Sequence, residues 1–547
     1  MNIFNSPLEA FLYWEENSPD LPFLKQPING NIITYTFKTA GTEVRKIASA
    51  LSDYKLPELS HIALLSKNCA HWIMSDLAIM MAGHVSIPIY PTLNADSINQ
   101  LLRHSESKAI IIGKLDNFVS QKSGIPDIHK ISIAMYGENE GDLWEDLIVK
   151  QQPMSKPYKP QKEDLITIIY TSGTTGTPKG VMHTVGNFMN SGNTLVNVLK
   201  TPEHPRLFSY LPLAHIAERN GTALQAYMRG AAIYFSESLE TFAGDLEAAQ
   251  PHVFFAVPRI WSKFQEKILY TIPQKKLNIL LNIPILKSII KRKLKQKLGL
   301  NEAMFVCSAA APLSSSIIKW FQKIDIFIQQ GYGMTEDSAI SHFNLPGANK
   351  IGTVGQPLPG VHAKLSEEGE ILIKNECLLK GYYKAPDITA TIFTEDGYLK
   401  TGDIGEYDHD GYLTITGRIK DQFKTDKGKY VSPTPIELKL SKNTYIEQIC
   451  IVGTGIPQPI ALITLSELAK KKTKNDLSKS LNSTVETINP TLEKHEKIEK
   501  VVIMKEDWTV DNGLTTPTLK VKRNSIEKIH QDYYKSWFEL KEHVIFE

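Results

Sequence analysis

The chain has 547 residues, of which 42% are hydrophobic and 22% charged, a composition typical of a soluble globular protein with two or more domains. Its 61 Lys and Arg residues nearly balance its 59 Asp and Glu residues, so the overall charge does not favour nucleic acid as a partner, and we expect none. The four cysteines are widely separated and no apolar signal segment follows Met1, so we expect neither a zinc site nor disulfides, and a cytoplasmic location.

The amino-terminal part alternates helix and strand patterns. Helical periodicity over residues 8–51 surrounds a short strand pair, a buried strand is expected at 61–66, and a helix at 72–81 precedes a strand, a helix and another strand that ends at 112. This alternation predicts an α/β fold with parallel sheet layers. The expected core residues of this part include Trp72, Ile79 and Met80.

A loop rich in glycine and hydroxyl side chains follows residues 165–170, an apolar run typical of a buried parallel strand. Glycines let backbone N–H groups approach an anion, hydroxyls donate hydrogen bonds and a lysine adds positive charge, so the loop suits a polyphosphate. It is not a Walker loop, because Pro178 replaces the second glycine and Gly180 follows the lysine. The simpler alternative is an ordinary strand-to-helix connection. The anion-binding candidates are Thr171, Ser172, Gly173, Thr174, Thr175, Gly176 and Lys179.

The string SGTTGTPKG at residues 172–180 resembles the phosphate loop of the adenylate-forming (AMP-binding) superfamily, and QGYGMTE, YLKTGD, GRIKDQ and TPTLKVKR follow in the family order. YLPLAHIAER and FAVPRIW favour the long-chain fatty acid acyl-CoA synthetase branch. The resemblance implies a large amino-terminal domain of stacked sheets and helices at 1–417. It also implies a small, mobile α+β carboxy-terminal domain at 418–547, with the active site between the two.

His215 stands between apolar residues in the YLPLAHIAER segment. A lone histidine in such a place is more often a packed structural residue. In the family, the matching loop carries an aromatic residue or a histidine that lines and gates the carboxylate site. The resemblance therefore makes His215 a candidate that orients the acyl carboxylate and does not act as a base.

A basic amphipathic helix is expected near residues 284–299, where apolar residues recur every fourth position and no acidic residue occurs between Lys287 and Gly299. The simpler interpretation is a solvated charged face whose leucines pack on the domain. Such a helix can also lie on an anionic membrane, so peripheral membrane contact is an alternative.

Two segments supply candidates for nucleotide binding. Small residues after the strand pattern at 306–308 leave room for a flat ring, and the resemblance places Ala310, Ala311 and Pro312 beside the adenine and acyl pockets. In the next segment Tyr332 can stack on a purine, Thr335 can hydrogen-bond the α-phosphate, and Glu336 offers an oxygen to Mg2+. The simpler alternative for this segment is a tight turn before a helix. The backbone candidates around Tyr332 are Gln330, Gly331 and Gly333.

The resemblance also assigns the ribose site, the hinge and a loop that acts in the thioester step. Asp403 would accept hydrogen bonds from the ribose hydroxyls, Arg418 would complete that site, and Lys420 would be the hinge. Lys424 and Gly428 belong to the loop of the thioester step, although a lysine cluster is otherwise a solvated turn.

Lys520 occupies the position at which the family has a lysine that enters the site during adenylation. Most members have S-G-K here and this chain has T-L-K, a variant that long-chain synthetases share. Lys522 is two residues away, and in an extended strand both side chains would point to one face, so the register stays open.

The implied reaction has two steps. A fatty acid carboxylate attacks ATP to give acyl-AMP and pyrophosphate, and CoA then displaces AMP. The implied cofactors are ATP, Mg2+ and CoA. Thr174, Thr175 and Lys179 would hold pyrophosphate, Glu336 the magnesium ion, and Lys520 would stabilise developing charge. The alternatives are an acyl-AMP ligase that loads a carrier protein, and a relative that binds nucleotide and fatty acid without turnover.

Overall fold

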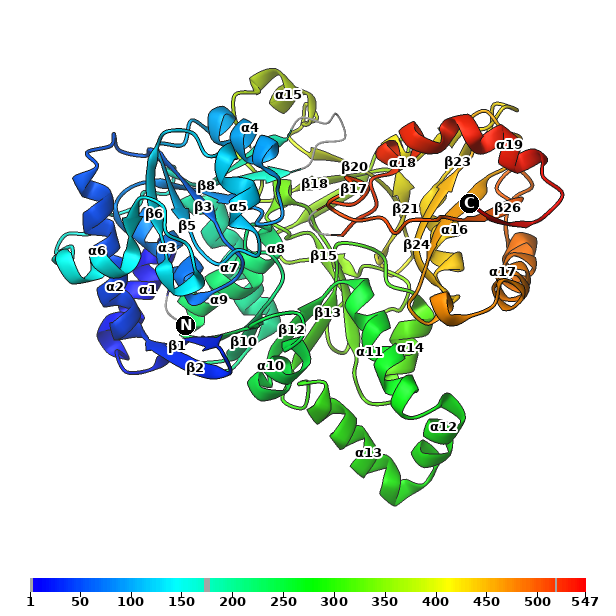
Figure 1. The fold of residues 1–547 in the computed structure, drawn as a ribbon, viewed down its shortest axis with the longest axis horizontal. Helices are drawn as coiled ribbons and strands as arrows, with labels where there is room; N and C mark the ends of the chain where they lie inside the picture. The colour runs from blue at the N-terminus through cyan, green and yellow to red at the C-terminus, as the bar shows by residue number, and fades with distance from the viewer. Residues whose placement is uncertain (1–2, 172–177, 517–518) are drawn as a thin grey trace.

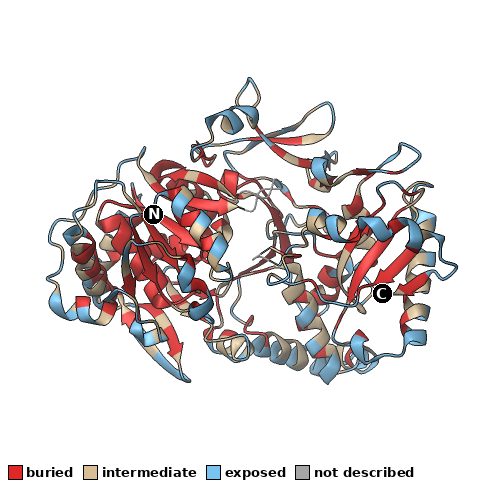
Figure 2. Cartoon of the chain, turned by 45° about the horizontal axis from the view of Figure 1, so that its top comes forward, coloured by how far each residue is buried: buried red, intermediate tan, exposed pale blue. Residues whose placement is uncertain are grey.

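The computed structural model describes residues 3–171, 178–516 and 519–547 of the chain (Figure 1). Two large sheets with their helices form the amino-terminal part, and a smaller sheet with its own helices forms the carboxy-terminal part on the right of the view. Buried residues concentrate on the strands of both parts (Figure 2).

An eight-stranded sheet carries the apolar strand that precedes the predicted phosphate loop. Its order is β19-β9-β8-β4-β3-β5-β6-β7. The strands are β3 (His61–Leu65), β4 (Val85–Ile89), β5 (Ala109–Ile112), β6 (His129–Ser132), β7 (Asp142–Leu143), β8 (Leu165–Thr171), β9 (Lys179–Thr184) and β19 (Gly381–Tyr382). Strands β3 to β8 pair in parallel, as the strand-helix alternation predicts, whereas β9 pairs antiparallel with β8 and with β19.

The predicted loop after β8 therefore leads into a strand, and the alternative of a strand-to-helix connection is wrong. Thr171 ends β8 and lies opposite Lys179, which begins β9. Strand β9 is largely buried, and the chain returns along it beside β8 before helix α7 (Val185–Leu199) begins.

A nine-stranded sheet packs beside the first, in the order β16-β15-β14-β13-β12-β10-β11-β1-β2. Its strands are β1 (Pro22–Ile28), β2 (Asn31–Thr36), β10 (Arg206–Ser209), β11 (Ala232–Phe235), β12 (Val253–Ala256), β13 (Phe305–Ser308), β14 (Ile328–Tyr332), β15 (His342–Phe343) and β16 (Gln356–Pro357). The strands from β1 to β14 in this order are parallel, and the strands at both edges are antiparallel.

The largest core lies between these two sheets. It joins side chains of β3 and β5 to side chains of β1 and β11 through helix α3 (Ala70–Met81), in which every residue is buried. A helix that is apolar on all sides is expected in such an interior position. The predicted core residues Trp72, Ile79 and Met80 are confirmed, with exposures of 0%, 0% and 3%.

The other helices cover the sheets or connect their strands. In the amino-terminal part they are α1 (Pro7–Asn17), α2 (Phe37–Asp53), α4 (Ala95–Ser105), α5 (Phe118–Gln121), α6 (Trp144–Lys150), α8 (Ile216–Glu218), α9 (Gln225–Arg229), α10 (Phe242–Ala249), α11 (Pro258–Thr271), α12 (Gln274–Asn282), α13 (Pro284–Lys297), α14 (Ser315–Gln322) and α15 (Pro386–Thr391). A π-helix, Arg219–Leu224, joins α8 to α9.

A four-stranded sheet and a second, smaller body complete the chain. The former contains β17 (His362–Leu365), β18 (Glu370–Lys374), β20 (Leu399–Tyr407) and β21 (Leu413–Arg418). After it come a two-stranded hairpin, β22 (Phe423–Lys424) and β23 (Tyr430–Val431), and a sheet of β24 (Ile446–Val452), β25 (Ile460–Leu465), β26 (Lys500–Ile503) and β27 (Val544–Phe546). The helices of this body are α16 (Pro433–Leu440), α17 (Lys474–Ile488), α18 (Arg523–His530) and α19 (Tyr534–Glu539).

Candidate active site

Several of the described site residues predicted from the sequence follow the carboxyl ends of parallel strands. Strands β13 and β14 are neighbours, with Ser308 opposite Gln330. The small residues from Ala310 to Pro312 come after β13, and Gly333 to Glu336 come after β14. Ligands of open α/β sheets bind outside the carboxyl ends of the strands, so this edge is where a ligand is expected.

Lys179 and Glu336 are brought together by a tyrosine. The Lys179 ammonium lies 5.0 Å from the centre of the Tyr382 ring, and the Tyr382 hydroxyl donates a 2.8 Å hydrogen bond to Oε1 of Glu336. Tyr382 stands in β19, which pairs with β9, so the sheet itself fixes the tyrosine beside the lysine strand. The carboxylate of Glu336 raises the pKa of Tyr382 further above the value that burial gives it.

The turn that presents Thr335 and Glu336 requires glycine before it. A Cβ at Gly333 would lie 2.6 Å from the backbone carbon of Ala339, so a larger residue would displace the turn. Asp337 closes the turn by accepting a 2.8 Å hydrogen bond from the Met334 N–H. Burial, with the nearby charge of Glu336, raises the pKa of Asp337 to about 7.

Asp403 is the centre of a second polar cluster. It is 3% exposed and accepts hydrogen bonds from the Tyr332 hydroxyl at 2.7 Å and from Nε of Arg418 at 2.6 Å. The Asp403 charge raises the pKa of Arg418 above its ordinary value. The predicted ribose residues and the predicted stacking tyrosine therefore form one hydrogen-bonded group, which links β14, β20 and β21.

His215 lies on the loop after β10, where its Nδ1 caps α8 by accepting from the Ala217 N–H at 3.2 Å. Burial, and secondly the charge of Lys520, lower the pKa of His215 to about 3, so the ring is neutral at physiological pH. Because Nδ1 accepts a hydrogen bond, the neutral ring carries its proton on Nε2, which can donate to a ligand. That His215 orients a carboxylate and does not act as a base stays a prediction.

Lys520 belongs to the carboxy-terminal body but interacts with residues of the amino-terminal part. Water reaches its side chain, yet the surrounding protein, and secondly the charge of Arg418, lower its pKa to about 8, while Asp403 acts in the opposite direction. The Thr516 N–H donates to the Lys520 carbonyl at 2.8 Å, and Thr515 pairs with Val521 in an isolated antiparallel bridge. The extended strand considered for Lys520 and Lys522 is therefore absent from the described residues here, and Lys522 is the N-cap residue of α18.

The remaining predicted residues of the carboxy-terminal body lie on a short 3-10 helix and in a hairpin that follow β21. Lys420 is exposed on a short 3-10 helix after β21. Lys424 and Gly428 lie in the β22–β23 hairpin, where Lys424 faces Tyr430 and the Asp426 N–H donates to the Ile456 carbonyl at 3.2 Å. Ser172, Gly173, Thr174, Thr175, Gly176 and Thr177 lie outside the described residues.

Sequence reasoning missed several residues that hold the site in place. Tyr382 was one of them, although the GYY string near the predicted ribose motif was a usable signal. Asn68 was another: its side chain contacts Leu211, Leu213 and Ser209, which in turn donates to the buried Glu218 at 2.8 Å. This network supports both ends of the segment that carries His215.

Arg219 was also missed, because the sequence does not indicate that an arginine is buried unless its acidic partner is known. It donates to Asp76 and to Thr167, both at 2.5 Å, and its neighbour Asn220 donates to the Ser338 carbonyl at 2.7 Å. These bonds connect the π-helix to α3, to β8 and to the turn after Glu336. The π-helix is a feature that occurs frequently at functional sites.

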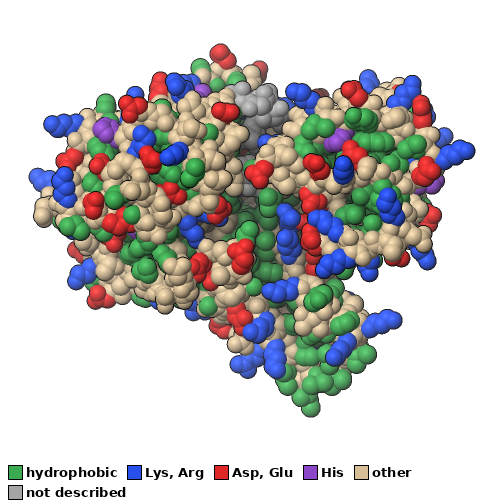
Figure 3. All heavy atoms as spheres, viewed as in Figure 1, with side chains coloured by type: hydrophobic (Ala, Val, Ile, Leu, Met, Phe, Trp, Pro, Cys, Tyr) green, Lys and Arg blue, Asp and Glu red, His purple; other side chains and the backbone are tan. Residues whose placement is uncertain are grey.

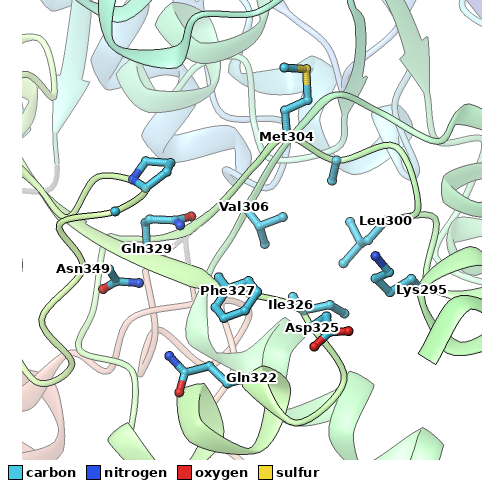
Figure 4. A pocket seen from close by; sticks show the side chains of 13 residues that line it. Lys295, Leu300, Met304, Val306, Gln322, Asp325, Ile326, Phe327, Gln329 and Asn349 are labelled. Atoms are coloured by element: carbon cyan, nitrogen blue, oxygen red, sulfur yellow. The ribbon is translucent and has the colours of Figure 1, made fainter. Parts of the chain in front are cut away.

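A separate pocket of about 520 Å3 lies at the opposite end of β13 and β14. Lys295 and Leu300 line it from the end of α13 and the segment after that helix. Val306 and Gln329 line it from the strands, and Phe327 from the position before β14 (Figure 4). These residues are at the amino ends of the strands, whereas the polar clusters follow the carboxyl ends. The pocket is therefore distinct from the candidate active site.

Two protein-family models match the chain. A model of the AMP-binding enzyme family matches residues 11–383, and a model of the AMP-binding enzyme C-terminal domain matches residues 420–540. The chain belongs to the AMP-binding enzyme family. The predicted adenylate-forming relationship is thereby confirmed.

The relatives of this AMP-binding enzyme include two curated proteins with long-chain acyl names. A long-chain-fatty-acid--CoA ligase of Mycobacterium bovis is 29% identical and covers 95% of this chain and 94% of its own length. The peroxisomal long chain acyl-CoA synthetase 6 of Arabidopsis thaliana is 29% identical and covers 91% of this chain and 80% of its own.

A solved structure confirms the predicted fold class. The A domain of carboxylic acid reductase from Segniliparus rugosus, in complex with AMP and a co-purified carboxylic acid, matches with a TM-score of 0.79. It is 20% identical and covers 97% of this chain and 94% of that one. The α/β architecture with a large amino-terminal and a small carboxy-terminal body is therefore that of the AMP-binding enzymes.

The residues present suit magnesium held jointly with a nucleotide. Within the described residues no three His, Cys, Asp or Glu side chains come together as a metal site. Glu336 is 8% exposed and its Oε1 accepts from Tyr382, whereas within the part of the chain that the structure describes its Oε2 has no hydrogen-bond partner. Mg2+ is usually bound by one or two carboxylates together with phosphate oxygens and water, so a single glutamate fits this ion.

Proposed function

We propose that this AMP-binding enzyme activates a fatty acid in two steps. The substrate carboxylate attacks the α-phosphorus of ATP, which forms acyl-AMP and releases pyrophosphate. The thiol of CoA then attacks the acyl carbon, which forms the thioester and releases AMP and the thiol proton. The substrate is already a nucleophile, so the protein needs to position the reactants and stabilise charge.

The position of Lys520 is the observation that carries this proposal. A lysine of the carboxy-terminal body acts electrostatically on His215, Asp403 and Arg418, which the amino-terminal part and the end of β21 supply. A cation at this place, between a ribose-type cluster and a carboxylate-orienting loop, can stabilise the negative charge that develops during adenylation.

The other residues take roles that agree with their geometry. Asp403 and Arg418 hold the ribose, Tyr332 lies against the adenine, and Ala310, Ala311 and Pro312 border it. Thr335 contacts the α-phosphate, Lys179 and the loop at 171–176 bind the departing pyrophosphate, and Glu336 holds magnesium, which screens phosphate charge when bound. His215, kept neutral by burial, orients the carboxylate.

The second step requires a different arrangement of the carboxy-terminal body in this proposal. We place the boundary between domains 1–417 and 418–547, with Lys420 as the hinge. Rotation about the hinge withdraws Lys520 and brings the hairpin with Lys424 and Gly428 towards the site. Domain rotation of this kind separates two chemical steps that share one site.

The named relatives support a long-chain acyl substrate and CoA as acceptor. Two of them are named for long-chain fatty acid or acyl-CoA activation, and the reductase domain of similar fold holds AMP beside a carboxylic acid. The same pair of ligands suits the two polar clusters described above.

The deciding experiment measures the two half-reactions separately in Lys520→Ala and in the matched control Lys522→Ala. Acyl-AMP formation from ATP, Mg2+ and a panel of fatty acids is quantified by mass spectrometry, and thioester formation is started from prepared acyl-AMP and CoA. We expect Lys520→Ala to lose adenylation by on the order of hundredfold and to keep the second step, because loss of one charge-stabilising contact has an effect of this size.

Other outcomes contradict parts of the proposal. Equal losses in both steps would contradict the proposal that Lys520 acts in adenylation and leaves the site before thioester formation. Acyl-AMP without acyl-CoA from the wild-type protein would favour a ligase that loads a carrier protein. No product with any fatty acid would favour a binding protein without turnover.

A further inference from the structure

Helices α12 and α13 form a hairpin that projects from the amino-terminal part, at the bottom of Figure 1. Its base is fixed to the domain. Leu277 is 1% exposed, Ile290 and Leu294 pack against a core cluster, and Lys291 makes a 2.6 Å ion pair with Asp325. The hairpin is therefore held in a defined orientation, and the side chains at its far end are exposed to solvent.

That far end is apolar. We define the hairpin tip as the five exposed aliphatic residues around the single-residue connection between the helices, and Figure 3 shows hydrophobic atoms at the lowest point of the molecule. Ile285 is 76% exposed and Ile279 63%, values that are costly in water for side chains of this size. The hairpin tip comprises Ile279, Ile283, Ile285, Leu286 and Ile289.

The rest of the hairpin is strongly basic. The net charge of the whole chain is only +2, but residues 274–297 contain no Asp or Glu. They contain Lys275, Lys276, Lys287, Lys291, Arg292, Lys293, Lys295 and Lys297. Within the described residues only Lys291 and Lys297 of these make ion pairs, so most of this charge is not neutralised by the protein.

We propose that the hairpin docks the protein on the surface of a lipid bilayer with anionic headgroups. The hairpin tip enters the boundary between headgroups and acyl chains, and the lysines and arginine behind it contact lipid phosphates. Among the residues that the structure describes, no helix has the length and hydropathy needed to cross a bilayer, so the contact is peripheral.

The arrangement of charge and apolar surface selects this partner. An interfacial segment buries an apolar end and keeps long basic side chains at headgroup level, which is the order found along this hairpin. Clustered lysines and arginines are attracted to anionic lipid by long-range electrostatics. A second copy of the chain would instead have to bring two basic hairpins together, which like-charge repulsion opposes.

Flotation with vesicles tests the docking. The full-length protein is mixed with vesicles of phosphatidylcholine alone or of phosphatidylcholine with phosphatidylglycerol, at low and at high salt. We expect binding to require phosphatidylglycerol and to weaken with salt, because screening shortens the reach of the basic residues. Equal flotation with both vesicle types, or none with either, would overturn the proposal.

Two variants with matched controls separate the contributions of the hairpin tip and of the charge. Each variant should lower vesicle partitioning by at least about tenfold. The tip variant combines Ile285→Glu with Ile289→Glu, and the charge variant combines Lys287→Glu, Arg292→Glu and Lys293→Glu. The controls change exposed residues elsewhere on the protein and should bind as the wild type does. They are Val119→Glu with Val149→Glu, and Lys479→Glu with Lys535→Glu and Lys541→Glu. Hairpin variants that float like their controls would refute the assignment.

A fluorescence measurement reports insertion directly. All four native cysteines are buried, so Ile285→Cys can be labelled selectively with an environment-sensitive fluorophore. Its emission should shift to the blue with phosphatidylglycerol vesicles, whereas the label on Val149→Cys should not respond. Equal responses at the two positions would exclude insertion of the hairpin tip.

Fold and activity are checked independently of docking. Each variant should keep the circular dichroism spectrum and the turnover of a short, water-soluble acid, because no hairpin residue is part of the candidate active site. If the tip variant instead converts a dimer of the wild type to a monomer and neither protein floats, the hairpin is a self-association surface and the membrane proposal fails. Docking without turnover would refute the proposed reaction alone.

Discussion

The candidate active site has two parts that differ in burial. On the side supplied by β14 and β20, Tyr332, Glu336 and Asp403 are each less than 10% exposed and have short hydrogen bonds to protein. On the side supplied by the carboxy-terminal body, Lys420, Lys424 and Lys520 are exposed. Buried groups that are hydrogen-bonded to one another keep one position, whereas exposed groups can move at little cost in free energy. We therefore expect the buried side to serve both half-reactions, and the exposed side to change its arrangement between adenylation and thioester formation.

The largest effect should follow from disturbing the buried side. Asp403→Asn removes the charge that holds the Arg418 guanidinium and, in the proposed function, the ribose, so both half-reactions should fall by on the order of hundredfold. Acyl-AMP formation and thioester formation from acyl-AMP are measured separately. The exposed Asp410→Asn is the control, and a loss confined to one step would show that the buried side does not serve both.

A change at the hinge should affect one step only. Lys420→Pro restricts the backbone, so adenylation should stay within about threefold of the wild type while thioester formation falls by at least about hundredfold. Lys420→Ala removes the same side chain without restricting the backbone, and should retain both steps. Normal thioester formation by the proline variant would count against a hinge at this position.

The pH dependence of adenylation should report the exposed lysine. The pKa of Lys520 is lowered to about 8, so the side chain is a charged ammonium at lower pH and loses its proton, and with it the charge, as the pH rises through this value. Adenylation should therefore be constant below pH 8 and decrease above it, by up to about tenfold per pH unit. Lys520→Arg, which stays charged, should lack this decrease, and an unchanged profile in that variant would assign it to another group.

The smallest effect should come from the ion pair that joins the two sides. Arg259 of α11 contacts Glu447 of β24 at 2.5 Å, and the two side chains are 40% and 22% exposed. Because a partly exposed pair contributes less than about 1 kcal/mol, Arg259→Ala should change the ratio of the two half-reaction rates only about twofold to fivefold. A double-mutant cycle with Glu447→Ala measures the coupling, and strictly additive effects would show that the pair does not hold this arrangement.

The sequence predicted the local elements and the strings that contribute to the site. The strands at 61–65 and 165–171, the helix at 70–81 and the basic helix at 284–297 all follow from apolar periodicity, which short-range burial imposes. The family strings also identified Tyr332, Asp403 and Arg418, which the structure brings together.

What the sequence did not predict depends on long-range pairing. Tyr382 reaches Lys179 only because β19 pairs with β9, and no periodicity within either segment indicates that pairing. Asn68, which supports the His215 segment, likewise accepts a hydrogen bond from the N–H of Leu213, which lies 145 positions further along the chain. The hydrogen bond from the Thr516 N–H to the Lys520 carbonyl was not predicted, because the polar and apolar residues around Lys520 are equally compatible with an extended strand.

The late position of β19 has a consequence for synthesis of the chain. Strand β9 is the edge of the eight-stranded sheet until residues 381–382 pair with it, some two hundred positions after β9 has left the ribosome. During that interval the nascent chain presents the open hydrogen-bonding edge of β9, which is a template for pairing with other chains. Truncated fragments that end before residue 381 should therefore aggregate more readily than the complete chain.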